Sequence, residues 1–277
     1  MDTATGRFGY QLTRVKNPPP FVPRLETYRL DYGGREQCRF DFWLANRAAE
    51  QWYHEWFYEA ANPTWELKEF SWLVQPGDRV LEIGCHHGFL TMMLAHCVGK
   101  KGAILAIDAN PENVLIANAQ ISTNRLGEIC SARTYACAAE AGTLTMEWRT
   151  NSHVVVGRPK DVACYEVEAI TGDELDRRYG PFNVLKLDVE GFEIQVLRGC
   201  RQLLERNPKL ILEVHPDFVR EYNYGDSLDE LWSLIGASKR TGTMVVRPHF
   251  DRSLPFAFDA VPANGIANLH LAPASLD

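Results

Sequence analysis

Short apolar runs alternate with helical stretches over most of this chain. The apolar runs occupy residues 80–83, 103–107, 184–187 and 210–214. Helical spacing of apolar residues covers residues 88–97, 111–125, 190–205 and 227–235. A wholly apolar short run is typical of a strand buried on both faces, and strands that alternate with helices favour a parallel sheet with right-handed crossovers. The pattern predicts an α/β fold.

The remaining segments of the main part of the chain have strand-like patterns without helices between them. Residues 133–137, 143–148 and 163–167 are strand-like, with a loop expected at 149–161. Two final strands are expected at 243–247 and 266–271, the second after the turn signal Asn264-Gly265. These segments add strands after the third strand and at the end of the sheet.

The N-terminal part forms an appendage in this interpretation. Residues 1–24 are polar and proline-bearing and predict an extended arm, followed by a short strand within 35–44. Residues 46–60 predict an amphipathic helix whose aromatic stripe serves packing or a substrate platform, and a second helix runs from Pro63 to the stop at residues 76–78. We therefore divide the chain into an appendage, 1–60, and a main domain, 61–277.

Composition narrows the possible functions. The 277 residues are 45% hydrophobic and 23% charged, which is ordinary for a globular protein, and the formal charge is −7. The absence of a basic stripe argues against nucleic-acid binding, and the acidic balance argues against an anionic membrane surface. There is no apolar run of about 18 residues, no signal-peptide pattern and no CxxC pair, so we expect a cytoplasmic protein without membrane partners.

A glycine-containing turn follows the first apolar run. Residues 80–83 lead into Gly84 and Gly88, spaced Gly-x-x-x-Gly, and a helix follows. This is neither the dinucleotide fingerprint nor a Walker A loop. Asp108 ends the next strand, about 20 residues further on, where a carboxylate can hold a ribose diol. Both features predict a nucleoside pocket, whereas the alternative is a plain strand–helix turn with a capping acid.

A second charged motif ends the strand at 184–187. Lys186, Asp188 and Glu190 alternate, so an extended chain would place them on one side. Three charges on one face of a buried strand are costly unless they are paired or functional. The structural alternative is a Lys–Asp pair with helix capping.

These motifs resemble those of class I S-adenosylmethionine-dependent methyltransferases, and the stretch 183–199 resembles the signature of the FkbM-type family. The resemblance covers about residues 60–215 and implies a Rossmann-like, doubly wound, mostly parallel seven-stranded sheet whose last strand is antiparallel. It implies S-adenosylmethionine as cofactor, with the methionine end near Glu82, Gly84 and Gly88 and the ribose at Asp108. The further cofactor-binding residues that it implies are Cys85, His86, Ala109, Ala138 and Ala139.

The His86-His87 pair departs from the small, apolar loop usual in that family. Adjacent side chains of a turn are expected to point in different directions, so we do not expect the two histidines to chelate a metal. They are expected to shape the pocket wall, or His86 to contact cofactor or substrate.

The resemblance implies O-methylation of hydroxyls on sugars, polysaccharides or secondary metabolites. A hydroxyl acceptor needs a general base, and we expect His215 or Asp188 in this role. Glu190 and Glu213 are expected to orient it, and Lys186 to hold Asp188 ionised. We assign no metal ligands. Asp188, Glu190 and Glu213 could offer oxygens to Mg²⁺, but no spacing demands it.

Three alternatives remain at this stage: an N-methyltransferase, a nucleotide-linked oxidoreductase and a non-catalytic cofactor-binding subunit. The acceptor is expected to be a small molecule or glycan, and the aromatic helix at 46–60 could be a pocket lid or a homodimer surface. The aromatic side chains expected around the acceptor are Trp52, Tyr53, Trp56, Trp65, Tyr222, Tyr224, His249 and Phe250.

Overall fold

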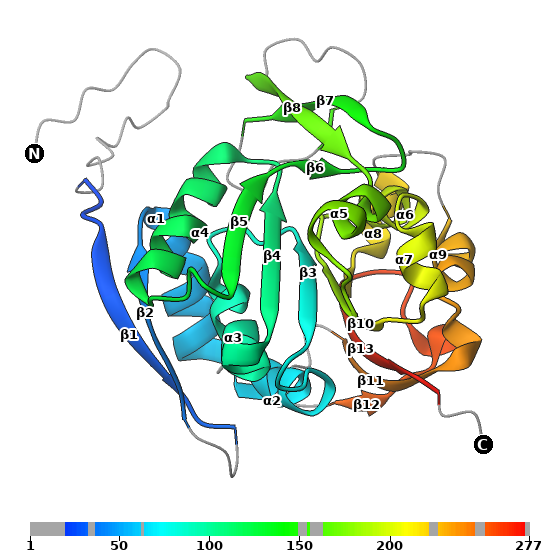
Figure 1. Cartoon of the computed structure of the whole chain (residues 1–277), viewed down its shortest axis with the longest axis horizontal. Coiled ribbons are helices and arrows are strands. Elements are labelled where there is room, and N and C mark those ends of the chain that lie inside the picture. The colour runs from blue at the N-terminus through cyan, green and yellow to red at the C-terminus, as the bar shows by residue number, and fades with distance from the viewer. Residues whose placement is uncertain are drawn as a thin grey trace, which may run out of the picture.

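The alternating strands and helices build one large sheet with helices on both faces (Figure 1). A computed structural model describes residues 20–32, 37–61, 64–148, 154–155, 163–221, 227–246 and 253–274. Residues 1–19 of the expected arm and nearly all of the expected loop at 149–161 lie outside the described residues, as does Pro63.

Eight strands make up the central sheet. In spatial order they are β12 (Leu254–Pro255), β11 (Arg240–Val246), β13 (Ala267–Pro273), β10 (Lys209–Val214), β9 (Val184–Leu187), β3 (Arg79–Ile83), β4 (Ala103–Asp108) and β5 (Cys130–Thr134). Neighbouring strands from β5 to β10 run parallel, and β13 runs antiparallel between β10 and β11. The expected sheet with an antiparallel last strand is confirmed, and the two-residue β12 is added at its edge.

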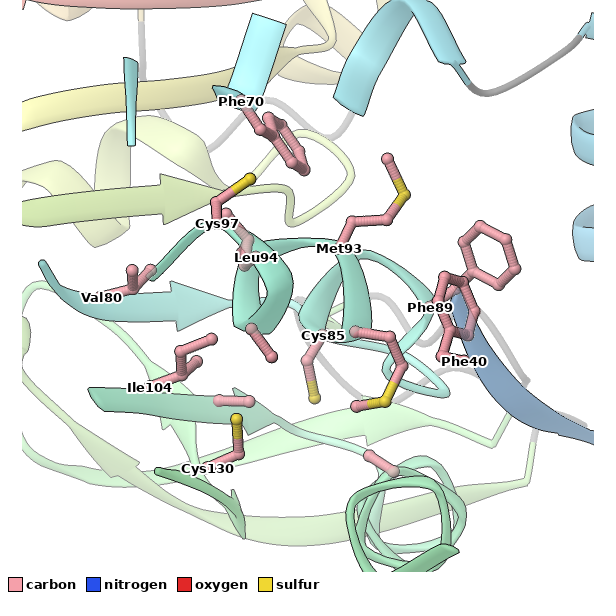
Figure 2. Close-up of a cluster of buried hydrophobic side chains, with 14 of the residues drawn as sticks. Phe40, Phe70, Val80, Cys85, Phe89, Met93, Leu94, Cys97, Ile104 and Cys130 are labelled. Atoms are coloured by element: carbon pink, nitrogen blue, oxygen red, sulfur yellow. The ribbon is translucent and has the colours of Figure 1, made fainter. Parts of the chain in front are cut away.

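Alternate residues of the buried strands face two separate helical layers. Val80 contributes to a core with α2 (Thr64–Leu73), α3 (Phe89–Val98) and α4 (Pro111–Thr123) (Figure 2). Leu81 faces a second core with α5 (Gly172–Tyr179), α6 (Glu193–Arg198), α7 (Arg201–Glu205) and α9 (Leu228–Leu234). This period of two explains why the strands read as continuous apolar runs.

A separate three-stranded sheet lies beyond the carboxyl ends of β3 and β4, at the top of Figure 1. Its strands are β6 (Ala136–Cys137), β8 (Cys164–Ile170) and β7 (Gly142–Glu147). The single strand expected at 133–137 is therefore wrong in detail. The chain leaves the central sheet after Thr134, and β6 pairs with β8 instead.

The appendage contains a hairpin that the sequence pattern showed only in part. β1 (Arg24–Leu30) pairs antiparallel with β2 (Cys38–Leu44) over seven residue pairs, whereas only a strand within 35–44 was expected. The residues after Asn46 are helical as expected, first in α1 (Arg47–Ala49) and then in η1 (Glu50–Ala61), which is wound as a π-helix. Tyr28, Phe40 and Phe42 join the core around Val80.

Three helical predictions need correction. No helix was expected at α5, whose eight residues include a single buried apolar side chain, Leu175, or at α8 (Pro216–Glu221). The helix expected over 190–205 begins only at Glu193, because Glu190 and Gly191 adopt positive φ angles of 52° and 97°. It also breaks at Gly199, which separates α6 from α7.

Within the described ranges, no helix combines the length and the apolar character that crossing a bilayer requires.

Candidate active site

The loop after β3 is fixed between the ends of two neighbouring strands. The backbone amides of Gly84 and Cys85 donate to the Ile107 carbonyl at the end of β4, at 2.9 and 3.0 Å. Gly84 has a φ of +82°, and a Cβ at this position would lie 1.7 Å from the Asp188 carbonyl oxygen. Glycine is therefore required by backbone conformation and by the close approach of the chain after β9.

Asp108 is held rigidly at the end of β4. Its Oδ2 accepts a hydrogen bond from the His86 amide at 2.8 Å, and its Oδ1 accepts from the Asn110 amide at 2.8 Å and from Asn113 Nδ2 at 3.1 Å. Burial raises the pKa of Asp108, and these donors oppose the shift. The loop after β3 and the start of α4 thus fix one orientation of this carboxylate.

The two histidines of the loop stack on each other, which corrects the expectation of divergent side chains. Their ring centroids lie 4.0 Å apart with an interplanar angle of 25°, and His86 has a φ of 48°. The Tyr53 hydroxyl hydrogen-bonds His86 Nδ1, and the Trp52 ring centroid lies 5.0 Å from that of His86. Burial lowers the pKa of His87 to about 4 and that of His86 well below its usual value, so both rings are neutral near pH 7.

A cavity opens at the carboxyl ends of β3, β4 and β9, between the glycine loop and the three-stranded sheet. Polar and apolar side chains both line it. The lining residues are Ile83, Gly84, His86, Asp108, Ala109, Asn113, Tyr135, Ala136, Cys137, Met146, Val154, Asp188, Val189, Glu190 and Phe192. In an open α/β sheet this position, at the reversal of strand order, is where ligands bind.

The structure brings part of the predicted cofactor set to this cavity. Gly84, His86, Asp108 and Ala109 line it. Five other predicted residues are not among its lining residues: Glu82, Cys85, Gly88, Ala138 and Ala139.

Two of these residues lie against other elements. Gly88 precedes α3 and faces Ala117 of α4, whereas Ala138 follows β6 and its amide donates to Ile170 of β8. The apolar wall comes from Cys137 and Met146, which belong to the small sheet that the sequence did not separate from the large one.

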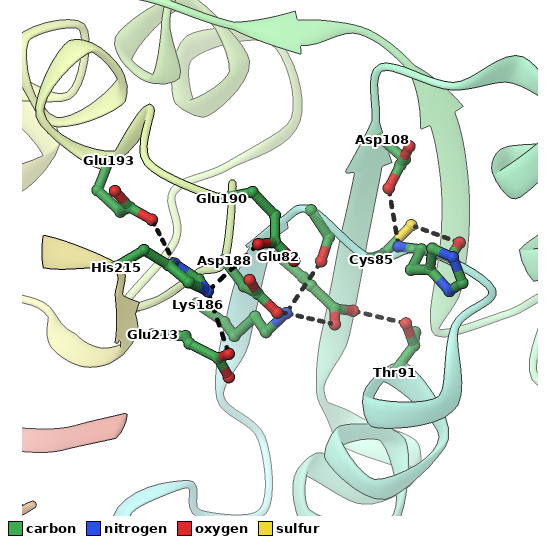
Figure 3. A network of polar contacts seen from close by, with 12 residues as sticks. Glu82, Cys85, Thr91, Asp108, Lys186, Asp188, Glu190, Glu193, Glu213 and His215 are labelled. Carbon is green, nitrogen blue, oxygen red and sulfur yellow. Dashed lines mark hydrogen bonds and ion pairs between the residues drawn. The ribbon is translucent and has the colours of Figure 1, made fainter. Parts of the chain in front are cut away.

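Glu82 instead belongs to a buried ionic cluster beneath the loop (Figure 3). It lies opposite Lys186 in the register of β3 and β9, with Lys186 Nζ 3.7 Å from Glu82 Oε1 and 3.7 Å from Asp188 Oδ2. Lys186 also donates to the Gly84 carbonyl at 2.9 Å. Burial opposes the lysine charge, but the surrounding carboxylates, Asp188 first, outweigh it and raise the pKa of Lys186 to about 12.

His215 follows β10 and lies among three carboxylates. Its Nδ1 is 2.8 Å from Glu193 Oε1, and its Nε2 is 3.3 Å from Glu213 Oε1 and 3.5 Å from Glu190 Oε2 (Figure 3). Burial opposes the imidazolium charge, but interactions with Glu193 and Glu213 outweigh it and raise the pKa of His215 to about 11. The ring therefore carries both protons near pH 7.

This protonation changes the choice of general base. An imidazolium cannot accept a proton, and His215, Glu213 and Lys186 are not among the residues that line the cavity. Asp188 and Glu190 do line it, and their side chains are 25% and 24% exposed. The two cavity carboxylates, with His215 behind Glu190, are thus the groups that can reach a bound acceptor.

The chemistry of the cavity fits S-adenosylmethionine. Asp108 offers an acceptor for a ribose diol, Cys137, Met146 and Phe192 offer an apolar wall for a purine, and Asp188 and Glu190 suit a cationic sulfonium or ammonium group. A doubly wound sheet with the antiparallel β13 and this site at its strand ends defines the class I methyltransferase architecture.

The family assignment agrees with this class. Residues 82–240, more than half of the chain, match the methyltransferase FkbM domain, and the chain belongs to this family of S-adenosylmethionine-dependent enzymes. No curated protein matches the sequence significantly. The appendage lies outside the matched residues.

Solved structures show similar folds at low identity. An FkbM methyltransferase from Methylobacillus flagellatus is 14% identical, with a TM-score of 0.45, over 70% of this chain and 44% of that one. An Aeropyrum pernix fibrillarin with bound S-adenosylmethionine is 14% identical, with a TM-score of 0.43, over 72% and 68%. A Thermotoga maritima O-methyltransferase is 15% identical, with a TM-score of 0.42, over 78% and 66%. The chain thus spans less than half of the Methylobacillus protein.

Proposed function

We propose that this chain O-methylates a hydroxyl group of a sugar, glycan or secondary metabolite. The observation that carries the proposal is the pair of carboxylates, Asp188 and Glu190, that face the cavity beside the glycine loop. A hydroxyl must lose its proton as the new bond forms, and a carboxylate within reach of the acceptor can take it. A neutral amine acceptor has no such requirement, which favours O-methylation over N-methylation.

Each residue has a defined part in this mechanism. Bound S-adenosylmethionine supplies a methyl group, which passes to the acceptor oxygen as the carbon–sulfur bond breaks and S-adenosylhomocysteine is left. Asp108 holds the ribose end, and Asp188 or Glu190 accepts the hydroxyl proton. His215 and Lys186 keep these carboxylates ionised and in position through the contacts described above. Alignment of nucleophile and methyl group contributes most of the acceleration, up to about 7–11 kcal/mol in favourable cases.

The acceptor is proposed to bind near the aromatic face of η1. Trp52 packs against His86, which itself lines the cavity, so this helix borders the site. Aromatic side chains suit sugar rings and flat metabolites alike. Tyr222, Tyr224, His249 and Phe250, also expected here, lie outside the described residues, as does the side chain of Trp56.

Calorimetric titration with S-adenosylhomocysteine is the first test. We expect micromolar binding that Asp108→Ala abolishes, because the variant lacks the only predicted ribose acceptor, whereas Asp229→Ala on the distant helix α9 should bind normally. Binding of NADH in place of S-adenosylhomocysteine would contradict the assignment and revive the oxidoreductase alternative.

Transfer of a radiolabelled methyl group to panels of hydroxyl and amine acceptors tests the reaction. We expect label on hydroxyl acceptors, with turnover reduced roughly 10²–10⁴-fold when the proton-accepting carboxylate is replaced in Asp188→Asn or Glu190→Gln. Label on amines only, or full turnover in both variants, would refute O-methylation by this mechanism. S-adenosylhomocysteine binding that the variants retain, even if weaker, would show that the cavity is intact.

A further inference from the structure

Three potential metal ligands meet where β9 and β10 end. One ligand atom each from Asp188, Glu213 and His215 lies within 4.8 Å of the other two. Asp188 also lines the cavity, so this group of three residues borders the proposed reaction site. His215 adds an imidazole nitrogen to the two carboxylates of this group.

His215 is fixed in the orientation of a metal-binding histidine. Its Nδ1 lies 2.8 Å from Glu193 Oε1, and both side chains are almost completely buried, at 2% and 1% exposed. This leaves Nε2 directed at Glu213 and Glu190, and Nε2 is buried without a hydrogen bond in the described part of the chain. A carboxylate behind the distal nitrogen is the usual support of a histidine that ligates a metal.

The local charge also favours a cation. Five carboxylates, those of Glu82, Asp188, Glu190, Glu193 and Glu213, surround one ammonium group and one imidazole. The ammonium group of Lys186 is already bonded to the Gly84 carbonyl. An excess of buried negative charge costs free energy. A divalent ion between Asp188 and His215 would compensate this charge.

We propose that Asp188, Glu213 and His215 bind one divalent metal ion of the Mn²⁺ type beside the cavity. Two carboxylates and one imidazole form a mixed oxygen–nitrogen donor set with coordination positions left open. Binding of the ion displaces the proton from Nε2 of His215 into the solvent. The proposal rests on the O-methylation proposed above and deepens it. The acceptor hydroxyl takes an open position, the ion makes it more acidic, and its proton passes to Glu190, the cavity carboxylate that is not a ligand.

Mn²⁺ binding can be measured by electron paramagnetic resonance, because the signal of free aqueous Mn²⁺ falls as the ion is bound. We expect one ion per chain with micromolar affinity, weakened at least tenfold in Glu213→Gln and His215→Gln. Glu193→Gln removes the negative charge behind the ring and should weaken binding 10–100-fold. Glu230→Gln, whose carboxylate pairs with Arg198 away from the site, is the matched control and should bind like the wild type.

The outcomes separate this proposal from the methyltransferase reaction. Thermal unfolding of each variant shows whether it folds, and Glu213→Gln, at a partly exposed carboxylate, keeps the test valid if His215→Gln does not. Mn²⁺ binding by the wild type that does not saturate would overturn the metal site. Equal Mn²⁺ affinity of the wild type and Glu213→Gln would also overturn it. S-adenosylhomocysteine binding without Mn²⁺ binding would refute the metal site but not the cofactor assignment. Mn²⁺ binding by the wild type without S-adenosylhomocysteine binding would support the metal site while refuting the cofactor assignment.

Discussion

The roles of single residues in this protein depend on burial and on interaction partners more than on residue type. Glu82 was expected beside the cofactor, but it is completely buried, accepts a hydrogen bond from the Thr91 hydroxyl at 2.6 Å and faces Lys186. His215 or Asp188 was expected to be the general base, but neighbouring carboxylates raise the pKa of His215 and keep it protonated. Sequence spacing places such residues at a strand end but does not give their protonation states.

His270 provides a test of burial at the residue scale. It is completely buried on β13, neither ring nitrogen has a hydrogen bond among the described residues, and burial lowers its pKa to about 4. The unfolded chain binds the proton first, at its ordinary pKa of about 6.5. The free energy of unfolding is therefore unaffected by this group above pH 6.5 and falls by about 3 kcal/mol as pH decreases from 6.5 toward 4.

Replacement of His270 separates titration from packing. We expect His270→Leu to unfold at a higher temperature at pH 7, because two unbonded buried nitrogens are removed, and to lose less stability between pH 6.5 and 4. His270→Asn should also lose less stability over that range, without the gain at pH 7. A pH dependence of thermal unfolding identical to that of the wild type in both variants would contradict the assignment.

At the scale of elements, the site depends on turns rather than on the strands and helices themselves. The turn after β3 lies against the chain after β9, and the turn after β9 delays the start of α6 through the positive φ of Glu190 and Gly191. η1 contacts the turn after β3, because the Tyr53 hydroxyl hydrogen-bonds His86. Periodicity predicts where strands lie, whereas these contacts between turns arise only when the strands are paired.

Gly84→Ala tests the most crowded of these turns. The added Cβ would lie 1.7 Å from the Asp188 carbonyl oxygen, on a backbone with φ of +82°, so the β3 turn and the β9 end must separate. We expect a loss of more than about 3 kcal/mol in the free energy of unfolding and weaker binding of S-adenosylhomocysteine. Chemical denaturation and calorimetry measure the two effects.

The matched control is Gly99→Ala, at the end of α3. Its φ is also positive, at +61°, but a Cβ there would meet nothing within 4 Å. Only backbone strain, about 1–3 kcal/mol, is expected, with binding retained. Equal effects of the two substitutions would show that strain rather than the contact with Asp188 makes Gly84 necessary.

At the scale of the whole molecule, the N-terminal hairpin shares a hydrophobic core with the main sheet. The rings of Tyr28, Phe40 and Phe42 lie 5.0, 5.2 and 5.1 Å from that of Phe89 in α3. Gln120 of α4 also donates to and accepts from the backbone of Trp43. The division into residues 1–60 and 61–277 remains a prediction, and these contacts indicate how it can be tested.

A fragment of residues 61–277 tests whether the main domain folds alone. We expect it to aggregate or to unfold without a cooperative transition, because loss of the hairpin exposes Phe89 and the core around it. A chain that lacks only residues 1–19 retains every described residue and serves as the control. A fragment that unfolds cooperatively near the wild-type temperature would show that the appendage is an independent addition.

The sequence by itself determined the strands of the parallel part of the central sheet, the glycine turn, the acid after the second strand and the family. These are local patterns, because an apolar run or a turn residue reflects burial and backbone geometry at its own position. Only the tertiary structure decided that β6 leaves the central sheet, that the hairpin joins the core and that Glu82 faces Lys186. Each of these depends on which distant segments meet, and the charge and burial that set the chemistry follow from that meeting.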